Sequence, residues 1–458
     1  MEVSTKESEE KPNSPRLRRL IEQSGKQNLK KEKIVHISFF NKKAIGSVLI
    51  ATVLAVVWTL GVSATSYVQT WPGPTGYGSA SGPQHGAQAG YTPTAFSGSA
   101  NLRVSGSTTV YPIVNEFKTN YGASDLPGIT ADVQQGGSGW GRDDTGIGWG
   151  DVAMSSSAFK TSGNQGVQPD GTTPMWDVTK IARDAICVII NSDVTGITHL
   201  TMAQIKSIYE DTSITSWKQI TDPVTSTIGN DIPIKIFARE LGSGTRSSIG
   251  DQCSFTKDAN QEYNLEIAKV TAVMGASWNR PTSNEAMQAD INTTDGSAAG
   301  GIGYVGLGFS VNSDGTPLAH ATEIQIVSSG TTAYSPTTLN VYTGLYPLAR
   351  FLQVGVLHGY QSPNAANATT LITGLTGEDG QKCVADQHFL KLFMDQDVNK
   401  NGKVNSTDVG AVGSAFNSVP TDPNWNVRAD VNRSGKVNST DVGSIGLYWN
   451  YDYSANMP

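Results

Sequence analysis

A twelve-residue pattern occurs twice near the end of this 458-residue chain, and its oxygen-bearing side chains restrict how that part can fold. The first copy, Asp397–Asp408, reads DVNKNGKVNSTD, and the second, Asp430–Asp441, reads DVNRSGKVNSTD. Oxygen ligands fall at positions 1, 3, 5, 9 and 12, and glycine stands at position 6, where the loop turns sharply. Calcium prefers such sets of oxygen ligands, so we predict two calcium ions, one in each loop.

The two loops offer matching ligands, with a backbone carbonyl at position 7 and a valine facing a small core at position 8. A module of about 60 residues can build only a small core, so the ions are expected to be needed for folding. The predicted ligands are Asp397, Asn399, Asn401, the Lys403 carbonyl, Asn405 and Asp408 in the first loop, and Asp430, Asn432, Ser434, the Lys436 carbonyl, Asn438 and Asp441 in the second.

Position 12 is aspartate rather than the glutamate of ordinary EF-hands, and the sequence NSTDVG is duplicated. With these features residues 395–458 resemble a type I dockerin, a small α-helical domain that binds a cohesin domain when calcium is loaded. Ser406-Thr407 and Ser439-Thr440 match the pair that reads the partner in many dockerins. The basic pair common in the following helix is absent, since Gly413-Ser414 and Gly446-Leu447 stand there. Calcium binding is therefore predicted more firmly than the identity of a cohesin-like partner.

No charged side chain occurs between Lys43 and Arg103, and the first part of this stretch, Ala44–Ser66, is apolar. A helix of this length reaches about 35 Å, which spans a hydrocarbon core of about 30 Å. Residues 1–43 hold 11 Lys/Arg and 6 Asp/Glu, so the basic flank predicts a cytoplasmic leader, with everything after residue 66 outside the cell. Residues 67–99, rich in Gly, Ser and Pro, are expected to form an extracellular linker.

Three interpretations of the apolar segment remain open: a permanent signal anchor, a secretory signal cleaved near Val62-Ser63-Ala64, and a pilin-like helix. The third rests on a resemblance. Lys42-Lys43-Ala44-Ile45-Gly46 and the apolar run after it look like the start of archaeal type IV pilins. This resemblance implies cleavage before Ala44 and either membrane anchoring or a homopolymer built through the helix.

Composition excludes several function classes. The net charge is −7, and the leader contributes +5, so the exported part is acidic, which argues against nucleic-acid binding. Three cysteines are too few for a disulfide framework and fit no zinc spacing, so we expect buried free thiols. None of the six histidines lies in a motif with a Ser or Cys nucleophile, so we expect no enzymatic activity.

Strand and helix patterns alternate through residues 100–394, with a Gly-rich turn recurring between a strand and the next helix. This order predicts an α/β fold in which the carboxyl ends of the strands face a cleft. The expected strands are 102–104, 181–191, 234–237 and 302–307, and the expected helices cover 111–121, 201–209 and the residues after 242–245.

Three turns combine glycine with hydroxyl residues: Gly106-Ser107-Thr108-Thr109, Gly136-Gly137-Ser138-Gly139 and Gly242-Ser243-Gly244-Thr245. Glycine allows a close backbone approach, helix N-termini add positive potential, and hydroxyls add donors. Arg239, four residues before Ser243, supplies a planar fork for two anion oxygens. Together these features predict a site for a small oxyanion.

The same region resembles the substrate-binding protein of the phosphate ABC importer, a type II periplasmic binding protein. The resemblance is found in GSTTVYPI (Gly106–Ile113), QQGGSGWG (Gln134–Gly141), DVAMSSS (Asp151–Ser157), IARDAICVIIN (Ile181–Asn191), LTMAQIKSIYEDTSITSWKQI (Leu200–Ile220), RELGSGTR (Arg239–Arg246), IGYVGLG (Ile302–Gly308) and YPLAR (Tyr346–Arg350). It implies two α/β lobes that close over phosphate. The implied phosphate contacts are Thr108, Thr109, Ser138, Ser156, Arg239, Ser243, Gly244 and Thr245.

Two positions depart from the pattern of the phosphate-binding family. Many relatives have arginine after the paired serines, where this chain has Ser157, and some have aspartate near the position of Ser156. A carboxylate there would accept a hydrogen bond from protonated phosphate and would repel sulfate. Asp151 could substitute, although its place before the strand favours a structural role. Selectivity between phosphate and sulfate therefore stays open.

The sequence thus predicts a surface-anchored, extracellular phosphate-binding protein that delivers phosphate to an ABC permease and docks through its dockerin. One alternative is a structural filament or scaffold subunit with residual anion binding. Another is a binding protein for a different oxyanion, such as sulfate, molybdate or tungstate. The expected parts are a leader (1–43), a transmembrane or pilin-like helix (44–66), a linker (67–99), a two-lobed domain (100–394) and a dockerin (395–458).

Overall fold

The structure, a computed structural model, describes residues 96–146, 150–162, 166–167, 172–240, 242–257, 269, 281–294, 296–359 and 364–458. The predicted leader, the apolar segment and most of the linker lie outside these residues. Within the described ranges, no helix is long and apolar enough to cross a membrane.

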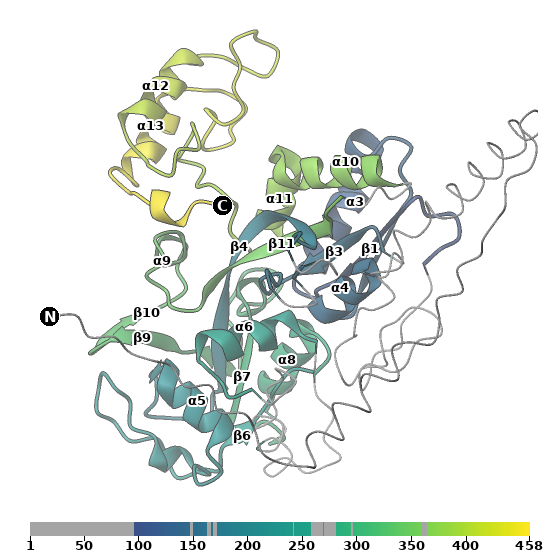
Figure 1. The fold of residues 1–458 in the computed structure, drawn as a ribbon. Coiled ribbons are helices and arrows are strands. Elements are labelled where there is room, and N and C mark those ends of the chain that lie inside the picture. The colour runs from purple at the N-terminus through teal and green to yellow at the C-terminus, as the bar shows by residue number, and fades with distance from the viewer. Residues whose placement is uncertain are drawn as a thin grey trace, which may run out of the picture. The chain divides into compact units, whose positions relative to one another are not determined.

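One continuous path of strands runs through the main domain in the order β2-β1-β3-β11-β4-β7-β6, with β8 beside β4. Figure 1 labels the strands of this path from β1 to β6. β1 lies parallel to β2 and β3, and β6 lies parallel to β7, whereas β4 is antiparallel to β11, β7 and β8. The strands are β1 (Leu102–Gly106), β2 (Ala131–Gln135), β3 (Val152–Ser155), β4 (Trp176–Asn191), β6 (Lys235–Ile236), β7 (Gly301–Gly306), β8 (Ala321–Glu323) and β11 (Ala349–Leu357).

The long strand β4 joins two lobes. Its first ten residues, 176–185, pair with β11, and its last residues, 186–191, pair with β7 and β8. Separate apolar cores lie on the two sides of this crossover. We call the side built on β1 lobe 1 and the side built on β7 lobe 2, and the predicted two-lobed α/β fold is confirmed.

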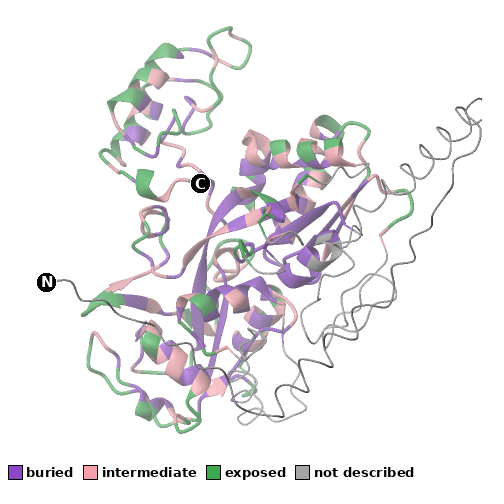
Figure 2. Cartoon of the chain, in the orientation of Figure 1, coloured by how far each residue is buried: buried purple, intermediate pink, exposed green. Residues whose placement is uncertain are grey.

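Helices cover the strands of both lobes, and Figure 2 shows buried strands beside helices with exposed outer faces. Lobe 2 also contains a three-stranded sheet of β5 (His199–Thr201), β9 (Gln325–Ser329) and β10 (Thr332–Tyr334). The helices of lobe 1 are α3 (Tyr111–Asp125), α4 (Ser138–Gly146), α10 (Ala365–Thr376) and α11 (Glu378–Asp386). Those of lobe 2 are α5 (Met202–Glu210), α6 (Gly244–Gln252), α8 (Asn284–Ile291) and α9 (Thr338–Tyr342), with short 3₁₀ turns at Trp217–Gln219 and Leu307–Phe309.

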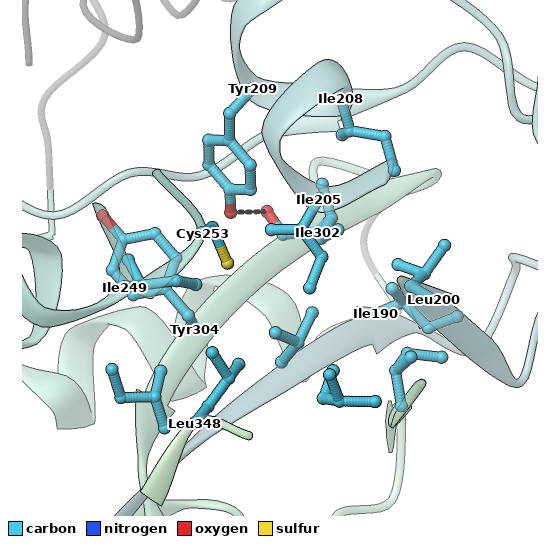
Figure 3. Close-up of a cluster of buried hydrophobic side chains, with 14 of the residues drawn as sticks. Ile190, Leu200, Ile205, Ile208, Tyr209, Ile249, Cys253, Ile302, Tyr304 and Leu348 are labelled. Carbon is cyan, nitrogen blue, oxygen red and sulfur yellow. Dashed lines mark hydrogen bonds between the residues drawn. The ribbon is translucent and has the colours of Figure 1, made fainter. Parts of the chain in front are cut away.

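The core of lobe 2 is packed between α5, α6 and the central strands (Figure 3). Its Tyr209 side chain is fully buried, and the Tyr209 hydroxyl donates to the carbonyls of Phe237 and Ile302. All three cysteines are free and buried, as expected, and burial raises the pKa of the Cys253 thiol to about 12. These thiols are therefore apolar core groups rather than nucleophiles.

The expected elements are confirmed, with shifts at their ends. Thr201 caps α5 in a capping box with Gln204, as the sequence predicted. The strand expected to begin at residue 181 begins at Trp176, because the polar residues ahead of it pair with β11. The strand expected at 234–237 shortens to two paired residues in β6.

The C-terminal module contains two helices, α12 (Ser406–Ser414) and α13 (Ser439–Gly446), and a final 3₁₀ turn at Ser454–Asn456. Val404 and Val437, at position 8 of the two loops, are fully buried in its core, as predicted. That core also includes Tyr342, which comes from α9 of lobe 2. The module therefore completes its core with a side chain of the two-lobed domain.

Leu371 tests how α10 is held on lobe 1. Its side chain is fully buried in the lobe 1 core. We expect Leu371→Ala to lower the free energy of unfolding by about 2–5 kcal/mol, because it removes buried methyl groups and leaves a cavity. Thr369→Ala, on the exposed side of the same helix, should change it by less than about 0.5 kcal/mol. Equal losses in urea unfolding of the two variants would contradict this packing.

Candidate functional site

Lobe 1 contributes two of the three Gly/hydroxyl turns. β1 ends at Gly106, whose φ is 137°, and an added Cβ would lie 2.3 Å from the Met154 carbonyl oxygen, so only glycine fits. The next residue, Ser107, accepts from the amides of Thr109 and Val110 at the start of α3. The hydroxyls of the next two residues, Thr108 and Thr109, make contacts with lobe 2.

The second turn leads into α4, which begins at Ser138. The Ser138 hydroxyl accepts from the Ser156 amide at 3.0 Å and lies 3.4 Å from the Ser156 hydroxyl. Both serines are buried. Ser138 and Ser156, both predicted to contact phosphate, therefore lie side by side in lobe 1.

Lobe 2 contributes the third turn and the arginine. Ser243 caps α6 by accepting from the Arg246 amide, so Gly244 and Thr245 form the first turn of that helix. Arg239 is 1% exposed and is held by Glu240, whose two oxygens lie 2.7 and 2.9 Å from Nε and Nη2. The remaining terminal nitrogen, Nη1, donates to Asn284 at 3.1 Å.

The predicted groups of the two lobes meet each other directly. Arg239 Nη2 donates to the Thr108 hydroxyl at 3.1 Å, and the hydroxyls of Thr109 and Thr245 lie 3.2 Å apart. Backbone groups join as well, since the Gly139 amide donates to the Gly242 carbonyl at 2.9 Å. The lobes are therefore closed on each other at this place.

All eight residues predicted to contact phosphate lie in this buried junction. Gly244 faces Ser138 and Ser156 so closely that an added Cβ would lie 2.1 and 2.5 Å from their hydroxyl oxygens. The structure thus brings together Thr108, Thr109, Ser138, Ser156, Arg239, Ser243, Gly244 and Thr245.

Three further side chains of the junction were not singled out from the sequence. Asn284 donates to the Thr109 hydroxyl, and Arg350 donates to the Thr245 hydroxyl and, through Nε, to Asp184 at 2.7 Å. Asp184 and Arg350 stand directly opposite each other on β4 and β11. The sequence does contain a sign of this ion pair, because a charged residue inside an otherwise apolar strand such as IARDAICVIIN needs a buried partner.

The charges of the junction cancel in pairs. Arg239 is paired with Glu240, and Arg350 with Asp184, and all four side chains are nearly or fully buried. Burial lowers the pKa of the Arg350 guanidinium, and Asp184 opposes that shift. The junction therefore presents hydroxyl, amide and guanidinium donors with little net charge, an arrangement that can hold a small oxyanion without doing chemistry on it.

Asp151 and Ser157 have structural partners. Asp151 accepts from the Arg103 guanidinium at 2.8 and 3.0 Å and from the Asn364 amide, as its predicted structural role requires. Arg142 of α4 donates to the hydroxyls of Ser155 and Ser157 at 2.9 and 3.0 Å. A guanidinium thus lies beside Ser157.

The two C-terminal loops have the same hydrogen-bond pattern, position by position. The first-position carboxylates, Asp397 and Asp430, each accept from the amides at positions 5 and 6. The twelfth-position carboxylates, Asp408 and Asp441, each accept from the amides at positions 3 and 9. Each loop therefore curls around its two aspartates, and Gly402 and Gly435 both have a φ of 79°.

Position 9 serves a second purpose in both loops. Asn405 and Asn438 are the N-caps of α12 and α13, and each forms a capping box with the aspartate at position 12. Their side-chain oxygens accept from Thr407 and Thr440. We therefore expect these asparagines to contact an ion through water, as is common at position 9.

The donor set of the loops fits calcium. The four aspartates are between 0% and 6% exposed, and no ion pair joins any of them to a cation among the described residues. Buried carboxylates of this kind need a compensating positive charge. In the described part of the chain no group of three His, Cys, Asp or Glu is placed to hold a metal ion. The predicted ligands beside the aspartates are amides, a hydroxyl and carbonyls.

Comparisons with known proteins agree with this reading of the two parts. Residues 81–376 match the PBP superfamily domain, so the chain belongs to that superfamily, and residues 395–445 match the dockerin type I domain. The phosphate-binding protein PstS of Staphylococcus saprophyticus is 24% identical over 258 residues, which cover 56% of this chain and 70% of that protein. The central domain is thus PstS-like, and the C-terminal module is a type I dockerin.

Two other similar proteins carry related names. The phosphate-binding protein PstS of Staphylococcus haemolyticus is 28% identical over 159 residues, which cover 35% of this chain and 48% of that protein. The solved structure of an ABC-type phosphate transport receptor from Vibrio cholerae has 22% identity and a TM-score of 0.45, and the match covers 63% of this chain and 99% of that one.

Calcium removal tests the two loops in the full-length protein. We expect a chelator to expose the amides of α12 and α13 to hydrogen exchange, because the buried aspartates would repel one another without a cation. An ion present at about 100 times its dissociation constant adds about 2.7 kcal/mol, or roughly a hundredfold in protection. Amides of α3, in lobe 1, provide the internal control. Unchanged exchange in α12 and α13 would contradict the calcium assignment.

Proposed function

We propose that this protein captures inorganic phosphate outside the cell and passes it to an ABC permease. The observation that supports this most strongly is the meeting of all eight candidate residues in one buried junction between two lobes. Two lobes that close over an oxyanion exclude water and surround it with donors. The match to PstS proteins favours phosphate as that oxyanion.

We propose that the hydroxyls of Thr108, Thr109 and Thr245 exchange their mutual contacts for contacts with phosphate oxygens when the anion enters. Arg239 would keep its hydrogen bonds to Glu240, which fix the plane of the guanidinium. Its Nη2 would donate to the anion in place of the Thr108 hydroxyl. Because both arginines are already neutralised by carboxylates, binding would depend on directed hydrogen bonds more than on net charge.

The remaining parts of the chain suggest where this capture takes place. The dockerin would attach the protein to a cohesin-like partner when its loops hold calcium. Residues 44–66 would tether it to the membrane, either as an anchor or as a pilin-like helix that polymerises. Both arrangements keep the binding domain at the cell surface.

A second candidate function is capture of another tetrahedral oxyanion, such as sulfate, molybdate or tungstate. The observation in its favour is that Ser156 carries no charge and that Glu240 and Asp184 are both engaged by arginines. A protonated phosphate would then have to donate to a hydroxyl or a carbonyl oxygen, whereas sulfate needs no acceptor at all.

Calorimetric titration of the full-length protein in calcium buffer tests the proposal, first with phosphate and then with sulfate. We expect tight binding of phosphate and at least about tenfold weaker binding of sulfate, a difference of about 1.4 kcal/mol. Equal binding of the two would favour the broader oxyanion function. No heat with any tetrahedral anion would leave the structural scaffold subunit as the better interpretation.

Gly244 tests whether closure of the lobes is needed. We expect Gly244→Ala to weaken phosphate binding by at least about tenfold, because the added methyl would collide with Ser138 and Ser156 only in the closed state. Gly122→Ala is the matched control, since an added Cβ in that helical position meets nothing within 4 Å. If both variants bound phosphate like the wild type, the anion site would have to lie elsewhere.

A further inference from the structure

The dockerin is joined to the strand that links the two lobes, and Arg183 of β4 lies at the centre of the contact. Arg183 is 2% exposed, and its Nε and Nη2 donate to the carbonyls of Leu392 at 2.9 Å and Asn456 at 2.6 Å. Its guanidinium also lies over the rings of Tyr342 and Tyr453, at 4.7 and 5.3 Å from their centroids. A buried cation on the linking strand is thus satisfied by the C-terminal segments and by α9.

The same contact reaches the first calcium loop but not the second. The Tyr453 hydroxyl donates to Asp397, the first ligand of loop 1, at 2.6 Å and accepts from the Met394 amide. The Tyr453 amide donates to the Gly402 carbonyl of the same loop at 2.7 Å. The final residues of the chain, including the Asn456 carbonyl that binds Arg183, are therefore held in place by loop 1.

Arg183 is also next to the anion junction. Its neighbour Asp184 points to the opposite face of the strand, as successive strand residues do, and binds Arg350 and the Leu307 amide. Arg350 in turn donates to the Thr245 hydroxyl at 3.1 Å. One dipeptide of β4 thus contacts the dockerin with one side chain and the anion junction with the other.

The dockerin contacts both lobes as well as the strand between them. In lobe 1, Arg428 of the dockerin lies 3.4 Å from Glu378 at the start of α11. In lobe 2, the Tyr342 ring packs against Tyr453 with centroids 5.0 Å apart. Opening of the lobes would move Glu378 and Tyr342 relative to each other, so these contacts fit one arrangement of the lobes. In this structure that arrangement is the closed one.

We propose that calcium in loop 1 strengthens anion binding, because it stabilises the closed arrangement of the lobes through Tyr453 and Arg183. The proposal rests on the proposed function of the anion junction. Calcium would hold Asp397 and the tail in place, and the docked tail would then favour closure. Because the coupling is reciprocal, phosphate should raise the affinity for calcium by the same factor.

Titration of the full-length protein with phosphate, in calcium and then in chelator, tests the coupling. In the wild type we expect the dissociation constant to rise roughly five- to tenfold when calcium is removed, in the usual range of such couplings. Arg183→Lys and Tyr453→Phe break the connection at its two ends, and each should reduce the calcium dependence to less than about twofold. A wild-type value that does not depend on calcium, or full dependence in both variants, would overturn the proposal.

Arg433→Lys is the matched control for Arg183→Lys. Arg433 is a half-exposed arginine at position 4 of loop 2, and Lys400 occupies the same position in loop 1, so lysine is tolerated there. This variant should keep the full calcium dependence of phosphate binding. Loss of that dependence would show that an arginine outside the Arg183 contact has the same effect, which would also overturn the assigned connection.

A second measurement separates failure of the coupling from failure of the proposed function. Ala123→Cys in lobe 1 and Thr212→Cys in lobe 2 are exposed positions for dye labels, while the native cysteines are buried. Without any anion, calcium should increase energy transfer between the labels. Increased transfer without phosphate binding would refute the proposed function alone. Phosphate binding and energy transfer that both ignore calcium would refute the coupling alone, and loss of both signals would refute both.

Discussion

The closed arrangement of the two lobes depends on hydrogen bonds that satisfy buried polar groups at the junction between them. Arg239 has donors on three nitrogens and almost no contact with solvent, so every one of them must find an acceptor inside the protein. Glu240, Asn284 and the carbonyls of Pro281 and Thr282 meet most of that requirement within its own lobe. Thr108 of the other lobe adds one more acceptor for Nη2. Closure therefore has a hydrogen-bonding reason besides the burial of apolar surface.

Pairing of the charges in the junction has a consequence for selectivity. With Arg239 and Arg350 each bound to a carboxylate, an anion entering the proposed site would meet donors whose positive charge is already balanced. Discrimination between anions would then depend on which oxygens of the anion carry hydrogen, because hydroxyl groups can accept as well as donate. Arg142 bears on the same question, since it places a guanidinium beside Ser155 and Ser157, next to the uncharged Ser156.

The sequence allowed the local chemistry of the junction to be predicted but not its partners. Ser243 caps α6, Ser107 accepts from the amides of the turn before α3, and Gly106 has the positive φ that its turn requires, as local patterns can indicate. Asn284 could not be found in this way, because its contact with Thr109 joins residues 175 positions apart. The pairing of Asp184 with Arg350 likewise depends on strand register, which is set by the whole sheet.

In the C-terminal module, too, the sequence predicted local features but not contacts between distant residues. The shape of its two loops was predictable from the sequence, because both copies follow one fixed local template. Its core was not, since Tyr342 of α9 lies among the buried residues of the module and donates to the Lys391 carbonyl. A small module gains stability by sharing such a side chain with a larger neighbour.

Sharing that side chain also makes the module depend on the state of its neighbour. Tyr342 belongs to α9 of lobe 2, and Val341 beside it is buried in the core of that lobe. A movement of lobe 2 would therefore move a residue of the dockerin core, and the final residues that pack on it would have to follow. Two domains that share one aromatic side chain and one buried arginine cannot respond to their ligands independently unless that contact is first broken.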